Sequence, residues 1–153
     1  MNQIASNRRP PSRRTQRGVG LVEVLIAVVV LAFGLLGIAA MQLTALRNSQ
    51  SALERSQAVA QTYAILDAMR ANDDLAVQGR YNIPETCAVP DAGDIVANDL
   101  HHWMETMQRV DVLGPRACGT ITCGARECKI KVSWDDTRAG GSDKEFVETT
   151  TQL

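Results

Sequence analysis

The sequence is poor in aromatic residues and histidine, and it lacks the common catalytic motifs. Its 153 residues include only two Trp, two Tyr, two Phe and two His. Surfaces that bind single-stranded nucleic acid combine basic residues with stacking aromatic side chains, so this composition argues against such a surface. G-x-S-x-G, H-E-x-x-H, G-x-G-x-x-G and P-loop patterns are all absent. We therefore expect no enzymatic activity, no cofactor and no metal site.

Proline is absent between Pro11 and Pro84, and the first part of this interval is almost free of charge. From Val19 to about Met41 the chain is apolar except for Glu23. A run of this length is enough to cross a hydrocarbon core of roughly 30 Å as a helix. A carboxylate costs up to about 2.5–3.5 kcal/mol at the middle of a bilayer. The presence of Glu23 in the run therefore requires a functional explanation.

The charge is distributed unevenly, although the net charge is only −1. Residues 1–18 contain five arginines and no acidic residue, so the rest of the chain carries −6. By the positive-inside rule, a basic flank before an apolar span keeps the N-terminus in the cytoplasm. An arginine-rich arm for nucleic acid is the weaker interpretation, because these arginines directly adjoin the span.

An ordinary secretory signal peptide is the alternative interpretation of the N-terminal end. Such a signal has a shorter apolar region, which is removed by cleavage at a small-residue site that follows it. Here the run is longer and contains Glu23. We therefore expect cleavage before the apolar run, which the mature protein keeps.

Gly18 and Glu23, separated by four residues in this setting, resemble the class III signal of type IV pilins and pseudopilins. In that family a prepilin peptidase cleaves after the glycine and methylates the new amino terminus. The resemblance implies cleavage between Gly18 and Val19, N-methylation of Val19, and Glu23 as the fifth residue of the mature chain. The run 24–39 is similar to that of PilV-type minor pilins, the type IV pilus modification proteins.

This resemblance also implies a location and a set of partners. We expect a cleaved leader at 1–18, a transmembrane and assembly helix at 19–41, and a periplasmic head at 42–153. The protein would cross the bacterial inner membrane once, with its N-terminus in the cytoplasm, and would enter the pilus at low abundance. Its partners would be prepilin peptidase, other minor pilins, the major pilin and the assembly platform in the inner membrane, with no nucleic acid.

The resemblance gives Glu23 an intermolecular role. In a bundle of pilin helices, Glu23 of one subunit could meet the amino group of Val19 on a neighbour and set the axial register. Pairing would offset part of the cost of a carboxylate in a low-dielectric environment. The alternative leaves Glu23 near the membrane surface without such a partner.

Hydrophobic periodicity predicts one helix from Val19 to about Arg70, whose second half packs on the head. The expected packing stripe consists of Val59, Tyr63, Leu66 and Met69, with Ala60, Ala64 and Ala68 between them. The expected polar faces carry Arg47, Glu54, Arg55 and Gln57. Residues 75–93 read as a loop. A second helix is expected around 94–110, with apolar residues Ile95, Leu100, Trp103, Met104 and Met107.

The C-terminal part changes to the alternation typical of strands. Strands are expected at 120–123 and 129–134, joined by a hairpin loop at 124–127, with a last strand from Glu145. Ile130, Val132 and Trp134 should share one face. Asp135 and Asp136 read as neighbouring loop acids that point apart. The expected fold class is α+β and pilin-like, with a long N-terminal helix packed on a small antiparallel sheet.

Four cysteines follow the long helix. They are Cys87, Cys118, Cys123 and Cys128. An even number in a small exported domain indicates disulfides, with three possible pairings. Metal binding would need closely spaced ligands with His partners, and the adjacent His101 and His102 do not face each other on a helix. Strand alternation places Cys123 opposite Cys128, which leaves Cys87 for Cys118.

Three classes of function are compatible with the sequence. The favoured class is a structural minor pilin that joins a priming complex at the pilus tip and promotes assembly. A minor pseudopilin of a type II secretion system would share the same N-terminal features. A binding module, such as a tip adhesin or a DNA-uptake pilin, is the third class. The charge of −6 and the few aromatic residues argue against the DNA-binding version.

Overall fold

The computed structural model describes residues 18–124 and 127–152, and the chain divides into two compact units, residues 1–40 and 41–153. Most of the leader expected at 1–18 lies outside the described residues. Helix α1 (Leu21–Ala71) contributes residues to both units.

In the first unit, α1 begins two residues after the expected start at Val19, and all described residues are exposed. Gly34 and Gly37 lie inside the helix and do not end it. By length and composition, α1 is the one described helix that could cross a membrane. No residue of its apolar window is buried by the part of the chain that the structure describes.

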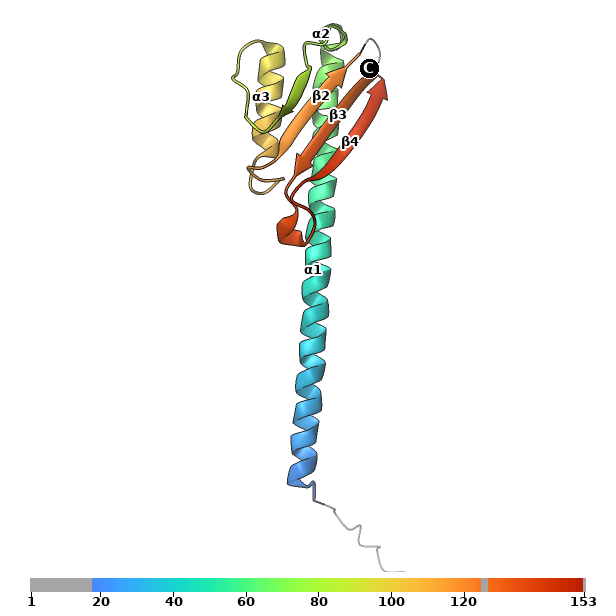
Figure 1. The fold of residues 1–153 in the computed structure, drawn as a ribbon, viewed down its shortest axis with the longest axis vertical. Coiled ribbons are helices and arrows are strands. Elements are labelled where there is room, and N and C mark those ends of the chain that lie inside the picture. The colour runs from blue at the N-terminus through green and yellow to red at the C-terminus, as the bar shows by residue number, and fades with distance from the viewer. Residues whose placement is uncertain (1–17, 125–126, 153) are drawn as a thin grey trace, which may run out of the picture. The chain divides into compact units, whose positions relative to one another are not determined.

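The second unit is a head built from the rest of α1, two shorter helices and a sheet. The remaining elements are α2 (Asp73–Val77), β1 (Ile83–Thr86), α3 (Ile95–Met107), β2 (Cys118–Cys123), β3 (Glu127–Trp134), the 3-10 helix η1 (Thr137–Ala139) and β4 (Glu145–Gln152). The strands pair antiparallel in the order β1-β2-β3-β4. In Figure 1 the head portion of α1 runs behind this sheet, and α3 lies beside β1. The expected α+β fold, a long N-terminal helix packed on a small antiparallel sheet, is confirmed.

The prediction of a loop at 75–93 is wrong in two places. It contains most of α2 and all of β1, a four-residue strand that includes Pro84. β1 pairs Ile83 with Ile121 and Thr86 with Gly119, with an irregularity between these pairs. Proline is tolerated on an edge strand. The hydrogen-bonding partner that makes β1 a strand is β2, which the local sequence does not indicate.

Helix α3 begins where the sequence predicts but ends earlier. Asp94 is its N-cap, and Asp94 Oδ1 accepts a hydrogen bond from the Ala97 amide at 2.9 Å. The helix ends at Met107, three residues before Val110. Ile95, which was expected to contribute apolar packing, is exposed, whereas Val96 is buried.

The face of α1 that packs in the head differs from the expected stripe. Its buried residues are Glu54, Ala58, Gln61, Thr62, Ile65, Leu66 and Met69. Leu66 and Met69 are buried as expected, but Val59 and Tyr63 are 37% and 54% exposed. Trp103 Nε1 donates to the Gln61 carbonyl oxygen at 2.9 Å. The indole therefore packs against a face of α1 that contains small and polar residues. The positions of the large apolar residues in the sequence did not predict this face.

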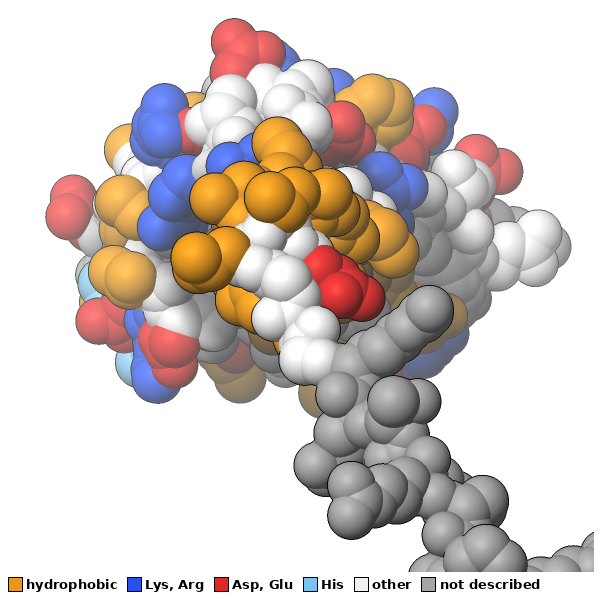
Figure 2. Space-filling view, turned by 90° about the horizontal axis from the view of Figure 1, so that it is seen from below, with side chains coloured by type: hydrophobic (Ala, Val, Ile, Leu, Met, Phe, Trp, Pro, Cys, Tyr) orange, Lys and Arg blue, Asp and Glu red, His pale blue; other side chains and the backbone are white. Residues whose placement is uncertain are grey.

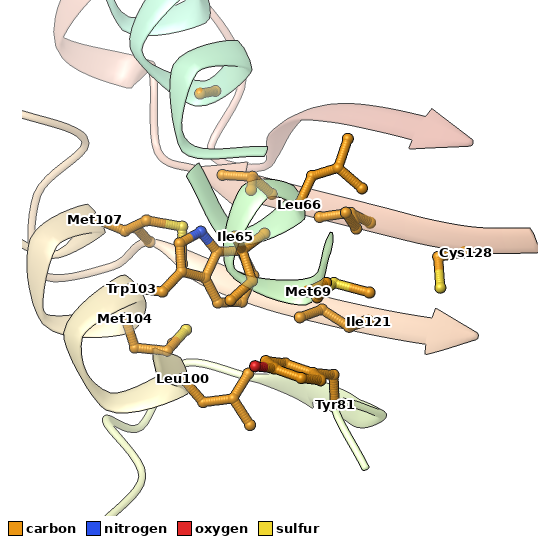
Figure 3. Close-up of a cluster of buried hydrophobic side chains, with 14 of the residues drawn as sticks. Ile65, Leu66, Met69, Tyr81, Leu100, Trp103, Met104, Met107, Ile121 and Cys128 are labelled. Atoms are coloured by element: carbon orange, nitrogen blue, oxygen red, sulfur yellow. The ribbon is translucent and has the colours of Figure 1, made fainter. Parts of the chain in front are cut away.

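The hydrophobic core joins α1, α3 and the inner face of the sheet. Figure 3 shows Ile65, Leu66 and Met69 of α1 close to Trp103 of α3 and Ile121 of β2. On β3 the side chains of Ile130, Val132 and Trp134 are all buried, as strand alternation predicted. Burial of apolar area stabilises the fold by roughly 25 cal/mol per Å².

Two disulfides link segments around the sheet. Cys123 pairs with Cys128, which lies directly opposite it in the β2–β3 register. Cys87, just after β1, pairs with Cys118 at the start of β2. These are the same two pairs that the sequence led us to expect, and no free cysteine is present among the described residues.

Candidate functional site at the start of helix α1

The segment just before α1 contains the bond at which cleavage is expected. Gly18, Val19 and Gly20 are not helical. The Gly20 carbonyl oxygen accepts from the amides of Glu23 and Val24, at 3.0 and 3.2 Å, and so begins the helical hydrogen bonding. A Cβ atom built on Gly18 would meet no described atom within 4 Å. Gly18 and Val19 are both exposed.

Glu23 lies in the first turn of α1, on an apolar face. A shallow groove along this face is lined by Val19, Glu23, Val24, Ala27, Val28 and Leu31. These residues recur at helical spacing and so lie on one face of the helix. Glu23 is the one polar side chain among them. A carboxylate in the first turn interacts favourably with the positive end of the helix dipole. No salt bridge joins Glu23 to another described residue. Its carboxylate is therefore available to form an ion pair with a cationic group of another molecule.

The surface around Glu23 is strongly hydrophobic. Figure 2, seen from below, shows hydrophobic side chains gathered at the near end of the helix. Leu21 is 91% exposed and Val19 is 71% exposed. Exposed apolar patches larger than a few hundred Å² on soluble monomers mark membrane or protein contacts. This end of α1 is therefore built for contact with lipid or with other apolar helices.

The cysteines of the head are structural, and its two histidines make contacts at or near the surface. All four cysteines are in disulfides. His101 Nδ1 lies 2.8 Å from the Pro90 carbonyl oxygen, and His102 lies 3.8 Å from Glu105 at the surface. Within residues 18–124 and 127–152, no three His, Cys, Asp or Glu side chains gather in a metal-binding group.

Three acidic residues of the head are buried. Glu54, expected on a polar face of α1, is only 7% exposed, and Asp135 and Asp136 are also buried. Asp135 pairs with Arg116, whereas Asp136 Oδ2 accepts from Ser51 Oγ. The burial of Glu54 lacked a sequence signal, because the large apolar residues of α1 indicated a different packed face. The two aspartates had none either, since their loop returns to α1 only in the folded head.

The chain matches the family described as the prokaryotic N-terminal methylation motif over residues 13–39. The matched region includes Gly18, Val19 and Glu23. No curated protein and no solved structure matches the chain significantly. The motif implies processing by prepilin peptidase and assembly with other pilins, and the apolar helix suggests membrane anchoring. The motif therefore supports a structural protein of the type IV pilin and pseudopilin superfamily.

Proposed function

We propose that this protein is a minor pilin that joins a priming or tip complex of the type IV pilus and promotes assembly. The observation that carries the proposal is the position of Glu23. It is the single carboxylate in the exposed apolar groove at the start of α1, inside the methylation motif. The similarity of the run 24–39 to PilV-type minor pilins favours the pilus over other assemblies.

In this proposal the sequence is divided by processing and by the membrane. Cleavage after Gly18 removes the arginine-rich leader 1–18 and leaves Val19 as a methylated amino terminus. Residues 19–41 cross the inner membrane until assembly, and residues 42–153 form the periplasmic head. The exposed Gly18–Val19 segment and the unbroken helix from Leu21 support this division.

The proposed role of Glu23 is electrostatic. When helices gather into a fibre, the groove around Glu23 loses contact with water, and an unpaired carboxylate becomes costly. The Val19 amino group of a neighbouring subunit keeps its positive charge after methylation and can donate a hydrogen bond to Glu23. Breaking such a pair leaves an uncompensated charge, which costs about 3–5 kcal/mol in a buried setting. A subunit added out of register would incur that cost.

A deletion strain tests the proposed assembly. We expect it to lose surface pili and twitching motility while exoprotein secretion continues, and the wild-type chain should restore both lost properties. If the strain keeps its pili and loses exoprotein secretion, the protein is a minor pseudopilin of a type II secretion system. Loss of adhesion with normal piliation would instead indicate a binding module.

A further inference from the structure

Two buried carboxyl groups interact where the loop after β3 packs on α1. Glu54 of α1 is 7% exposed, and Asp136 of the β3–β4 loop is 2% exposed. The loop is held in a compact form by backbone hydrogen bonds, from Asp136 N to Ser142 O at 2.9 Å and from Gly141 N to Asp136 O at 3.0 Å. In Figure 1, η1 of this loop lies beside α1 at the lower end of the sheet.

Each carboxyl group has only one oxygen with a partner. Ser51 Oγ donates to Asp136 Oδ2 at 2.6 Å, and Gln50 Nε2 donates to Glu54 Oε1 at 3.3 Å. The other two oxygens, Glu54 Oε2 and Asp136 Oδ1, are buried and receive no hydrogen bond. Leaving a buried acceptor unsatisfied costs about 1–3 kcal/mol, and more when the group is charged.

Among the residues that the structure describes, no donor bonds to either of these two oxygens. Trp134 Nε1 is also buried but bonds to neither oxygen. The nearby cations are engaged elsewhere or act only through space. Arg55 pairs with Glu145 at 3.2 Å, Arg116 pairs with Asp135, and Arg138 on η1 affects Glu54 through its charge alone.

We propose that Glu54 and Asp136 share one proton, so that they form a pH-dependent clasp between α1 and the β3–β4 loop. When Glu54 is protonated on Oε2, that hydroxyl group donates to Asp136 Oδ1. One hydrogen bond then satisfies both unpartnered oxygens. Ser51 Oγ already donates to Asp136 Oδ2, so Oδ1 is the Asp136 oxygen left to accept from Glu54. Two carboxyl groups in one buried site cannot both ionise without strong repulsion.

The surroundings favour the protonated form of Glu54. Burial is the largest cause that raises the pKa of Glu54, and the adjacent carboxyl group of Asp136 raises it further. Gln50 and the charge of Arg138 act in the opposite direction without cancelling the increase. A proton fits this site better than a metal ion, since no third carboxylate, His or Cys joins the pair among the described residues.

The direction of the pH effect follows from this raised pKa. The folded state binds the proton more tightly than the unfolded chain, so the clasp contributes fully below the unfolded value of 4.5. Its contribution falls as the pH rises toward the raised folded pKa and is lost above it. The loop should therefore hold α1 more firmly in mildly acidic conditions and less firmly in alkaline ones.

Two isosteric variants of the full chain test the clasp in detergent micelles. Glu54→Gln and Asp136→Asn each provide an amide donor that replaces the shared proton. We expect both to match the wild-type melting temperature at about pH 4, below the unfolded pKa, and to exceed it at about pH 8. Glu105→Gln, which changes an exposed carboxylate on α3, should follow the wild type at both pH values. Fluorescence of the buried Trp103 and Trp134 reports unfolding of the head.

Infrared spectroscopy gives a measurement that does not depend on stability. The wild type should show a protonated carboxylic acid band above the unfolded pKa of a glutamate, and Glu54→Gln should lack it. The proposal is overturned if no such band exists, or if both variants lower the melting temperature equally at the two pH values. It is also overturned if Ca²⁺ raises the wild-type melting temperature and Glu54→Gln abolishes that rise, because a cation would then occupy the site.

Discussion

The indole ring of Trp103 lies directly over Gly119, so no side chain fits at position 119. A Cβ atom built on Gly119 would lie 2.6 Å from Trp103 Cη2 and 3.1 Å from Met104 Sδ. Gly119 belongs to β2 and pairs with Val132 of β3, while Trp103 belongs to α3 and donates to the Gln61 carbonyl of α1. This one contact therefore joins the sheet to α1 and α3.

Gly119→Ala should destabilise the head by about 1–3 kcal/mol, because the added methyl group overpacks the core. Trp103→Phe in the same chain should recover part of this loss, since the smaller ring leaves room for the methyl group. A double-mutant cycle of denaturant unfolding measures the coupling. Gly93→Ala is the matched control, because its Cβ would meet Ala97 at an ordinary 3.5 Å. Equal effects of Gly119→Ala with and without Trp103 would contradict the contact.

Processing should stop when Gly18 is replaced by a bulky residue such as Phe. We expect an uncleaved precursor that remains in the membrane and keeps its arginine-rich leader. Intact-mass measurement should give wild-type protein that begins at Val19 with one added methyl group. A wild-type amino terminus at any other residue would refute the assignment of Gly18 and Val19.

Glu23→Gln and Glu23→Val should leave the protein cleaved and inserted but unable to support piliation. Removing the charge makes the span more apolar, so insertion should improve by about 1–3 kcal/mol. Glu23 belongs to the first unit and not to the head, so the protein's level in cells should stay normal. Counting surface pili in a complemented deletion strain, with immunoblots for protein level, checks this. Full piliation with Glu23→Gln would exclude the register role.

The two disulfides should differ in their contribution to stability. Cys87–Cys118 spans 31 residues and Cys123–Cys128 spans five. The chain-entropy estimate gives about 3–4 kcal/mol for the longer loop and about 2 kcal/mol for the shorter one. Paired Cys→Ala variants should therefore lose more stability at 87 and 118 than at 123 and 128. Non-reducing peptide mapping tests the connectivity, and a peptide linking Cys87 to Cys123 would contradict it.

Tyr81 should titrate unusually late and couple alkaline pH to unfolding. Its hydroxyl donates to Asp99 Oδ2 at 2.5 Å and accepts from Asn72 Nδ2 at 3.0 Å. Burial, followed by the hydrogen bond to Asp99, raises the pKa of Tyr81 to about 12. The folded state thus keeps a proton that the unfolded chain releases near its ordinary value of 10, so stability falls as pH rises between these values.

The measurement uses the fact that the chain has only two tyrosines. Tyr63→Phe leaves Tyr81 as the single phenol, whose ultraviolet absorbance should change near pH 12 together with unfolding. Tyr81→Phe should lose about 1–2 kcal/mol at neutral pH because the Asp99 hydrogen bond is gone. Titration of Tyr81 near pH 10 in the folded protein would contradict its burial.

The sequence alone was sufficient for features that depend on neighbouring residues. Gly18, the apolar run and Glu23 are recognisable because cleavage signals and membrane spans are read along the chain. The alternation of Ile130, Val132 and Trp134 predicted the buried face of β3, since a strand has a fixed period of two. The position of Cys123 opposite Cys128 follows from the same hairpin.

The tertiary structure decided features that depend on distant partners. Periodicity predicted that α1 has a packed face, but the position of Trp103 selected Gln61 and Thr62 over Val59 and Tyr63. β1 is a strand because β2 offers it hydrogen bonds, which its four residues do not indicate by themselves. Glu54 and Asp136 are far apart in the chain, so only the return of the β3–β4 loop to α1 brings the two carboxyl groups together in a buried site.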